Sequence, residues 1–258
     1  MNKKYFFFDI DGTLTDNATH KVVPSAERTL HELEKNGHFV AIATGRAHYK
    51  AVNFTNSIDI HNLVCYGGGC LVMNDEIVDN TPLEKDKCIE LLENADRDGL
   101  GWLICLDDSD KVYFNSTRFL TQVGLRKELT TYIYQEDLDY HNIGDIYKIY
   151  LVMPEGTEEQ HSWINNIGHL RMNKDYFVIQ YDAKNEGILR MLKHLGAKEE
   201  DVVVFGDDMN DLVMFSPKWT SIAMGNACDA LKEKASYVTD KNVNDGIEKA
   251  CRHFGWIK

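Results

Sequence analysis

The sequence has few prolines, no closely spaced cysteine pair and no long hydrophobic run. Four prolines in 258 residues and a hydrophobic fraction of 43% argue against a disordered chain and allow a sizeable core. None of the six cysteines belongs to a Cys-x-x-Cys pair, so neither a zinc ribbon nor a thioredoxin-like site is indicated. No stretch reaches the roughly 20 apolar residues of a membrane helix.

Basic residues are also scarce. The chain has 28 Lys and Arg against 41 Asp and Glu, a formal net charge of −13. This balance argues against wrapping nucleic acid or an anionic membrane, since both attract clustered Lys and Arg. The apolar run at residues 5–8 is too short for a secretion signal and ends at Asp9. We therefore expect a cytoplasmic protein, which would need a bound cation or a few placed bases to handle an anionic substrate.

Short apolar runs alternate with helical stripes at both ends of the chain. A helix is expected after Pro24, with Ser25 as a candidate N-cap, because apolar residues recur there at helical spacing. This alternation predicts an α/β fold with a doubly wound, mostly parallel, Rossmann-like sheet. The predicted buried strands are residues 5–10, 38–44, 62–66 and 201–205.

The middle of the chain has a different pattern of expected strands and helices. A hairpin is expected across residues 102–114, a strand at 146–153, a helix at 158–167 and a strand at 176–181. We therefore predict an inserted α+β domain. The predicted domains are a core of residues 1–81 and 183–258 and an insertion of residues 82–182.

The segment Asp9-Ile10-Asp11-Gly12-Thr13-Leu14 follows the first predicted strand directly. Ligand sites of doubly wound sheets lie at the carboxyl ends of strands. Two carboxylates two residues apart repel each other unless a cation or a proton lies between them. The alternative is an ordinary Asp-Gly turn with a solvated Asp9.

Two further segments suit the binding of an anion. Thr44 and Gly45 end the second predicted strand and would offer a hydroxyl and backbone N–H groups at a strand-to-helix junction. Lys184 precedes a predicted helix, where a cation opposes the helix dipole unless an anion is held nearby. The alternatives are simple helix capping at Thr44 and a solvated Lys184.

The segment Gly206-Asp207-Asp208-Met209-Asn210-Asp211 follows another buried strand. Three carboxylates and an amide at a strand end suit a hard cation with oxygen ligands, most simply Mg²⁺. Helix capping by aspartate is the alternative, although capping needs only one of the three acids.

Together these segments resemble the haloacid dehalogenase superfamily of phosphohydrolases, in its Cof-type group with a large α/β (type IIB) cap inserted between the second and third motifs. The resemblance spans nearly the whole chain. Its motifs are DxDGTL at residues 9–14, TGR at 44–46, the lysine at Lys184, GDxxND at 206–211, and the segments 223–227 and 245–246.

The resemblance implies a phosphatase mechanism. Asp9 would attack phosphorus to form an aspartyl-phosphate, and Asp11 would be the general acid and then the general base. Mg²⁺ would be held by Asp9, by the backbone carbonyl of Asp11 and by Asp207. The phosphoryl group would be held by Thr44, Gly45, Lys184 and Asn210, while Asp208 and Asp211 would orient Lys184 or metal-bound water.

The sequence departs from the family pattern in two places. Gly67 stands where the family often has Asn after its third strand, and Asn185 and Glu186 separate Lys184 from the glycine that usually follows at once. Neither change touches the nucleophile or the metal ligands, so the expected reaction class is unaffected.

We therefore expect a Mg²⁺-dependent phosphatase of a small phosphorylated metabolite, most simply a sugar phosphate. A phosphosugar mutase on the same fold is an alternative, and it would need extra basic residues in the insertion to rebind a bisphosphate. A non-catalytic sugar-phosphate sensor is the other alternative, although Asp9, Asp11 and Asp207 are all present.

Overall fold

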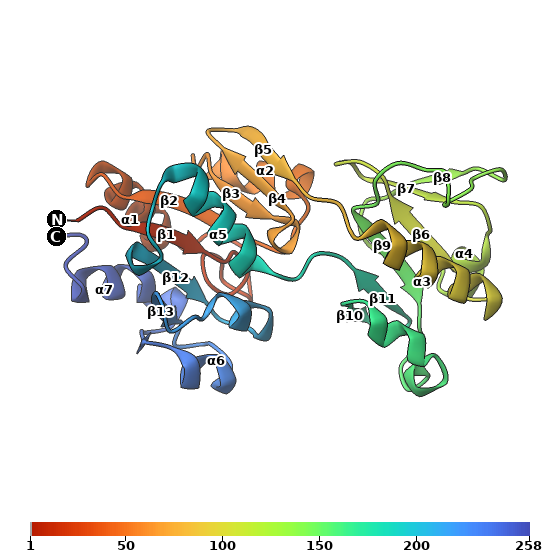
Figure 1. The fold of residues 1–258 in the computed structure, drawn as a ribbon. Coiled ribbons are helices and arrows are strands. Elements are labelled where there is room, and N and C mark those ends of the chain that lie inside the picture. Colours follow the sequence, from red (N-terminus) through yellow and green to blue (C-terminus); the bar gives the residue numbers. More distant parts are fainter. Residues whose placement is uncertain (1) are drawn as a thin grey trace. The chain divides into compact units, whose positions relative to one another are not determined.

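The computed structural model describes residues 2–258, which divide into two compact units. The core unit is the chain up to Asn80 together with Ala183–Lys258, and the inserted unit is Thr81–Asp182 (Figure 1). The ranges predicted from the sequence differ from this division by one residue, at the first junction.

The core unit contains one eight-stranded sheet with the order β14-β13-β12-β1-β2-β3-β4-β5. Neighbouring strands are parallel from β14 to β3, whereas β4 and β5 are antiparallel additions at one edge. This confirms the predicted doubly wound, mostly parallel sheet. The strands are β1 (Tyr5–Phe8), β2 (Phe39–Ala43), β3 (Leu63–Cys65), β4 (Cys70–Met73), β5 (Glu76–Asn80), β12 (Val202–Gly206), β13 (Thr220–Ala223) and β14 (Tyr237–Val238).

Helices cover both faces of the core sheet because its central strands are apolar on both sides. On one face Phe8 belongs to the same buried hydrophobic cluster as Leu30 of α1. On the other face Phe7 belongs to a second cluster with Ile188 of α5. The first face carries α1 (Pro24–Lys35), α2 (His48–Ser57) and α7 (Gly246–His253), and the second carries α5 (Lys184–Leu195) and α6 (Asp229–Lys234).

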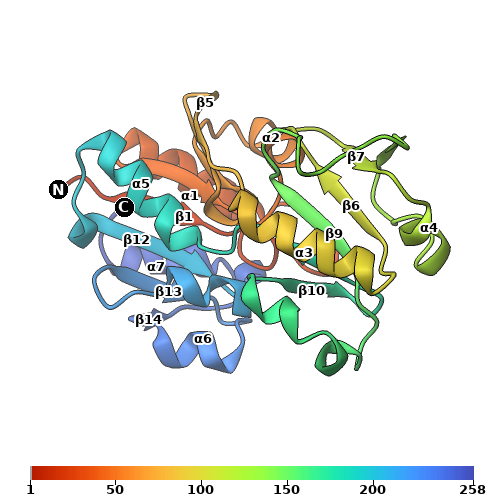
Figure 2. The ribbon, with the colours of Figure 1, turned by 45° about the vertical axis from the view of Figure 1, so that its right-hand side comes forward.

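The inserted unit has its own six-stranded sheet, in the order β10-β11-β9-β6-β7-β8. All pairs are antiparallel except β7 with β8, and α3 buries an apolar stripe in the same cluster as these strands, across which it lies in Figure 2. The elements are α3 (Lys85–Arg97), β6 (Trp102–Cys105), β7 (Lys111–Phe114), α4 (Arg118–Gln122), β8 (Thr131–Tyr134), β9 (Lys148–Val152), β10 (Leu170–Asn173) and β11 (Tyr176–Ile179).

Two local predictions were wrong. Ser25 is not the N-cap of α1, because Pro24, which has no N–H to lose, is the first helical residue and Val23 precedes it. The helix predicted at residues 158–167 is instead two short 3₁₀ helices, Glu158–Gln160 and Ser162–Asn166, separated by His161 with non-helical φ and ψ. Within residues 2–258, no helix has both the length and the apolar character of a membrane span.

Candidate active site

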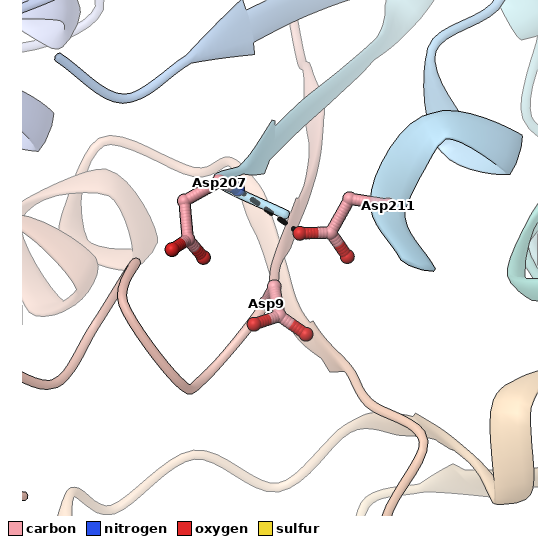
Figure 3. A group of neighbouring side chains, drawn as sticks. All are labelled: Asp9, Asp207 and Asp211. Atoms are coloured by element: carbon pink, nitrogen blue, oxygen red, sulfur yellow. Dashed lines mark hydrogen bonds between the residues drawn. The ribbon is translucent and has the colours of Figure 1, made fainter. Parts of the chain in front are cut away.

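The carboxyl ends of β1, β2 and β12 bring three of the predicted segments together. Phe8 pairs with Ile42 of β2 and with Phe205 of β12, so these strands end at nearly the same level. Asp9 and Asp207 follow directly, and Figure 3 shows their carboxylates near one another and near that of Asp211. One carboxylate oxygen from each of the three lies within 4.8 Å of the others.

Lys184 is buried among these acids and is not a solvated helix-start residue. Its ammonium donates to Asp9 Oδ1 at 2.8 Å and to Asp211 Oδ1 at 2.7 Å, and only 1% of its side chain is exposed. Although burial disfavours the charged form, these two carboxylates raise the pKa of Lys184. Lys184 is therefore a fixed cation beside the Asp9 carboxylate.

Asp211 and Asp208 have different tasks. The second oxygen of Asp211 accepts the backbone N–H groups of Asp207 and Asp208, at 3.0 and 3.4 Å. Asp211 is thus occupied by Lys184 and the backbone, which suits the predicted orienting role. Asp208 is exposed and accepts the N–H of Met209 at 2.7 Å, at the start of a 3₁₀ helix, Met209–Met214. Asp208 and Asp211 together form a capping box at this helix start, so the capping alternative describes Asp208 and part of what Asp211 does.

Asp207 is held by the loop that follows β1. Thr13 Oγ1 donates to Asp207 Oδ1 at 3.2 Å, and a Cβ placed on Gly12 would lie 1.9 Å from Asp207 Oδ2. Gly12 also has φ of +82°, a conformation that favours glycine. The Asn226 amide donates to the Gly12 carbonyl at 2.8 Å. A residue with any side chain at position 12 would therefore displace the Asp207 carboxylate.

The three acids carry more negative charge than one lysine neutralises. Burial and repulsion from Asp211 raise the pKa of Asp9 to about 8 and that of Asp207 to about 7. Both groups would become fully ionised if a cation joined them. Because the oxygens of Asp211 are already occupied, Asp9 and Asp207 are the side chains available to a hard cation such as Mg²⁺, and oxygen donors at this density fit that ion.

The Asp11 carboxylate lies outside this acid cluster. Its two oxygens accept from a single nitrogen of Arg46, Nη2, at 2.7 and 2.9 Å, and 56% of the side chain is exposed. The sequence prediction gave Asp11 two tasks, a backbone carbonyl ligand and a general acid–base carboxylate. Of these two groups, only the carboxylate has a hydrogen-bond partner among the described residues. The partner is Arg46, and this ion pair was not predicted from the sequence.

The predicted phosphate-binding residues are placed unequally. Thr44 is buried at the end of β2, and its hydroxyl accepts the N–H of Arg46 at 3.1 Å, while Gly45 is half-buried between them. Lys184 is in the acid cluster. Asn210 is exposed on the first turn of the 3₁₀ helix Met209–Met214, and no described contact joins its side chain to the cluster.

The glycine turn after β3 connects to Lys184. Gly67 and Gly68 have φ of +61° and +106°, and a Cβ on Gly68 would lie 2.3 Å from the carbonyl oxygen of Ala183. The N–H of Ala183 donates to the Gly67 carbonyl at 2.8 Å. The turn that departs from the family pattern therefore packs directly against the residue that precedes Lys184.

The second departure has a similar explanation. A Cβ on Gly187 would lie 2.8 Å from Gly68 Cα, so the close approach of helix and turn falls at the first glycine after Asn185 and Glu186. One turn further along α5, Arg190 donates to Asp79 at 2.8 Å and to the Gly68 carbonyl at 2.7 Å. These contacts fix the amino end of α5 against the core sheet.

The sequence prediction gave no individual role to Arg46, Asn226 and Thr13, and it expected of Gly12 only a sharp exit from the strand. Arg46 and Asn226 stood inside recognised segments, but their partners are 35 and 214 residues away along the chain. Gly12 and Thr13 stand in the same segment as the predicted nucleophile Asp9, and their contacts with Asp207 appear only when β1 and β12 are paired. Their position inside the motifs was the only available signal.

A parallel sheet whose strand ends gather a buried aspartate, a buried lysine and further acids, with a Thr-Gly loop alongside, defines a hydrolase that acts on phosphate esters. The chain belongs to the haloacid dehalogenase-like hydrolases, whose family model matches residues 6–251. It is a phosphoric monoester hydrolase of the Cof-type group, as the resemblance implied.

Relatives of known sequence or structure agree with this membership. YkrA of Bacillus subtilis (strain 168), named as a candidate phosphatase, is 30% identical over the full length of both chains. The crystal structure of a protein of unassigned function from Geobacillus kaustophilus HTA426 has a TM-score of 0.80 with 28% identity, covering 99% of this chain and 100% of that one. The subclass IIB sugar phosphatase BT4131 shares the fold, with a TM-score of 0.76, 24% identity, and coverage of 99% and 100%.

Proposed function

We propose that this hydrolase is a Mg²⁺-dependent phosphatase of a small phosphomonoester, most simply a sugar phosphate, that works through an aspartyl-phosphate. The observation that carries the proposal is the pairing of Asp9 with Lys184. A carboxylate that is 8% exposed at a strand end, beside an ammonium at 2.8 Å, is placed to attack a phosphorus atom whose oxygens the same ammonium attracts.

The reaction balances in two steps. A carboxylate oxygen of Asp9 forms a bond to phosphorus while the bond from phosphorus to the ester oxygen breaks, and Asp11 gives its proton to that leaving oxygen. Asp11, now ionised, then takes a proton from water as the water oxygen bonds to phosphorus and the Asp9 carboxylate departs. Thr44 and Gly45 at the end of β2 would bind the phosphoryl oxygens through a hydroxyl and a backbone N–H.

The acid cluster supports the metal requirement. Asp9 and Asp207 would hold Mg²⁺ together with the backbone carbonyl of Asp11. When bound, the ion offsets the repulsion between a carboxylate nucleophile and a phosphate dianion. Asp211 would keep Lys184 in place, and Thr13 would keep Asp207 in place, so the chain's own contacts hold both ligand carboxylates before substrate arrives.

The arginines of the inserted unit favour hydrolysis over phosphoryl transfer to a second sugar. A mutase has to rebind a bisphosphate and would need unpaired cations. The four arginines here already contact acids within the same unit, Arg97 with Asp98, Arg118 with Asp96, Arg126 with Glu128 and Arg171 with Glu158.

A sugar phosphate as substrate is also in keeping with the name of the structural relative BT4131. No disulfide links the six cysteines within residues 2–258, in keeping with the cytoplasm as the proposed setting.

The test is turnover of phosphate esters by the purified protein and its Asp9→Asn variant. With Mg²⁺ and a panel of sugar phosphates, we expect hydrolysis by the wild type and none by D9N. Asp201→Asn is the matched control, because Asp201 pairs with Lys4 at 2.7 Å at the start of β12, away from the acid cluster. Full activity of D9N would overturn the mechanism. Wild-type phosphate binding without turnover would favour the sensor, and retention of phosphate on sugar products would favour the mutase.

A further inference from the structure

The ion pair between Arg46 and Asp11 joins two loops of the core unit. Arg46 Nη2 donates to both oxygens of Asp11, at 2.7 and 2.9 Å, and the two residues follow different strands, β2 and β1. Among the described residues no other hydrogen-bond partner contacts the Asp11 carboxylate. With 56% of its side chain exposed, Asp11 would rotate freely without this contact.

Arg46 is itself fixed by the predicted phosphate-binding loop. Its backbone N–H donates to Thr44 Oγ1 at 3.1 Å, and its carbonyl accepts the N–H of Tyr66 at 2.8 Å. The guanidinium also lies 5.8 Å from the centre of the Phe54 ring of α2. The backbone that carries Arg46 is thus part of the same structure that holds the Thr44 hydroxyl.

We propose that Arg46 is a positioning residue that holds the Asp11 carboxyl group where it can protonate the leaving oxygen. This inference rests on the proposed function and names a residue for the acid–base step. Because one nitrogen serves both oxygens, one contact can be released while the other remains. Asp11 enters the step as the carboxylic acid, with a proton taken up from solvent on the released oxygen. That oxygen gives its proton to the ester oxygen as the phosphorus–oxygen bond breaks, and the other oxygen stays on Arg46.

The inference predicts a dependence on the leaving group that a purely structural role would not produce. p-Nitrophenyl phosphate and phenyl phosphate have similar shapes, but p-nitrophenolate leaves readily without a proton and phenolate does not. Positioned acid catalysis contributes about 10²- to 10⁴-fold to rates. We therefore expect Arg46→Gln to raise the ratio of kcat/KM for p-nitrophenyl over phenyl phosphate by about tenfold or more, as Asp11→Asn should, because kcat/KM reports the step in which the ester bond breaks.

Double substitution tests whether Arg46 acts through Asp11. If it does, adding R46Q to D11N leaves the kcat/KM ratio where D11N alone puts it. Arg46→Lys should restore part of the wild-type ratio, because an ammonium can donate to one carboxylate oxygen, and this variant also serves if R46Q folds poorly. Arg252→Gln is the matched control: Arg252 pairs with Glu248 at 2.8 Å on the exposed side of α7, and its ratio should match the wild type.

The possible outcomes separate the two proposals. A wild-type protein that hydrolyses neither ester would contradict the proposed function. A wild type that hydrolyses both, with an R46Q ratio equal to its own, would overturn the positioning role alone. Additive effects of R46Q and D11N on the ratio would overturn it as well, because they would mean that Arg46 acts on the substrate directly.

Discussion

Lys184 Nζ and Asp9 Oδ1 lie 2.8 Å apart in a buried site, although the two residues are 175 positions apart in the chain. Removing the ammonium would leave Asp9 and Asp211 facing each other without their shared cation. Loss of one partner of a buried pair typically costs about 3 to 5 kcal/mol of unfolding free energy.

We expect Lys184→Met to abolish most phosphatase activity and to lower the urea midpoint of unfolding in the absence of metal. The comparison is Lys249→Met, which breaks an exposed pair with Asp240 in the same unit. Activity is measured with saturating Mg²⁺, and stability by urea titration. Equal effects of the two substitutions would show that burial of Lys184 among the acids has no energetic importance.

Gly12→Ala should weaken Mg²⁺ binding. The new Cβ would meet Asp207 Oδ2 at 1.9 Å, and the backbone would have to keep φ at +82°. Gly37→Ala separates these two causes, since Gly37 has φ of +86° and open space where its Cβ would lie. Left-handed backbone alone costs an alanine about 1 to 2 kcal/mol. We expect both variants to lose stability and only G12A to lose Mg²⁺ affinity, as measured by calorimetry.

Without metal, the protein should become less stable as the pH rises from about 4 to about 8. The pKa of Asp9 is raised to about 8 and that of Asp207 to about 7, both above the usual value of 3.8. Between these limits the folded protein binds more protons than the unfolded chain, so the stabilisation is present in full below pH 4 and is lost as the pH passes the folded pKa values.

Added Mg²⁺ should therefore raise the melting temperature more at pH 8 than at pH 5, since it competes with protons for Asp9 and Asp207. Thermal unfolding of the wild type with and without Mg²⁺ across this range measures the effect. A Mg²⁺-induced shift that is largest at pH 5 would contradict the assignment of these two carboxylates.

Asp208 and Asp211 should respond differently to truncation. Asp208→Ala removes an exposed cap, which typically costs about 1 kcal/mol of unfolding free energy. Asp211→Ala leaves Lys184 without one acceptor and two backbone N–H groups unsatisfied. We expect a much larger fall in kcat for D211A than for D208A in steady-state assays, and equal losses would mean that the two acids share one task.

The central strands of the core and the residues that end them could be predicted from the sequence, because an apolar run and the residues that follow it are local features of the chain. Asp9 and Asp207 immediately follow apolar runs, and parallel strands bring such positions to one edge. The position of Ser25 shows the limit of local patterns: a serine and a proline both fit the first turn, and only the backbone decides between them.

Side-chain partners across the fold could not be predicted in the same way. Whether Asp11 turns toward Arg46 or toward Asp207 depends on side-chain rotation, about which spacing carries no information. The burial of Lys184 depends on how closely α5 approaches the Gly67–Gly69 turn. That approach is possible because Gly187 in α5 and Gly68 in the turn are both glycines. The segment at 158–167 has a helical stripe, but short stretches do not sustain an α-helix without long-range packing.

The turn at Gly67 and Gly68 also anchors both junctions with the inserted unit. Arg190 binds the Gly68 carbonyl and Asp79, next to the first junction, while the Ala183 N–H binds the Gly67 carbonyl at the second. The points where the chain leaves and re-enters the core unit are thereby held by one turn, which also packs against the residue before Lys184. These contacts all lie within the core unit, so the position of Lys184 does not depend on which residues are inserted between 80 and 183.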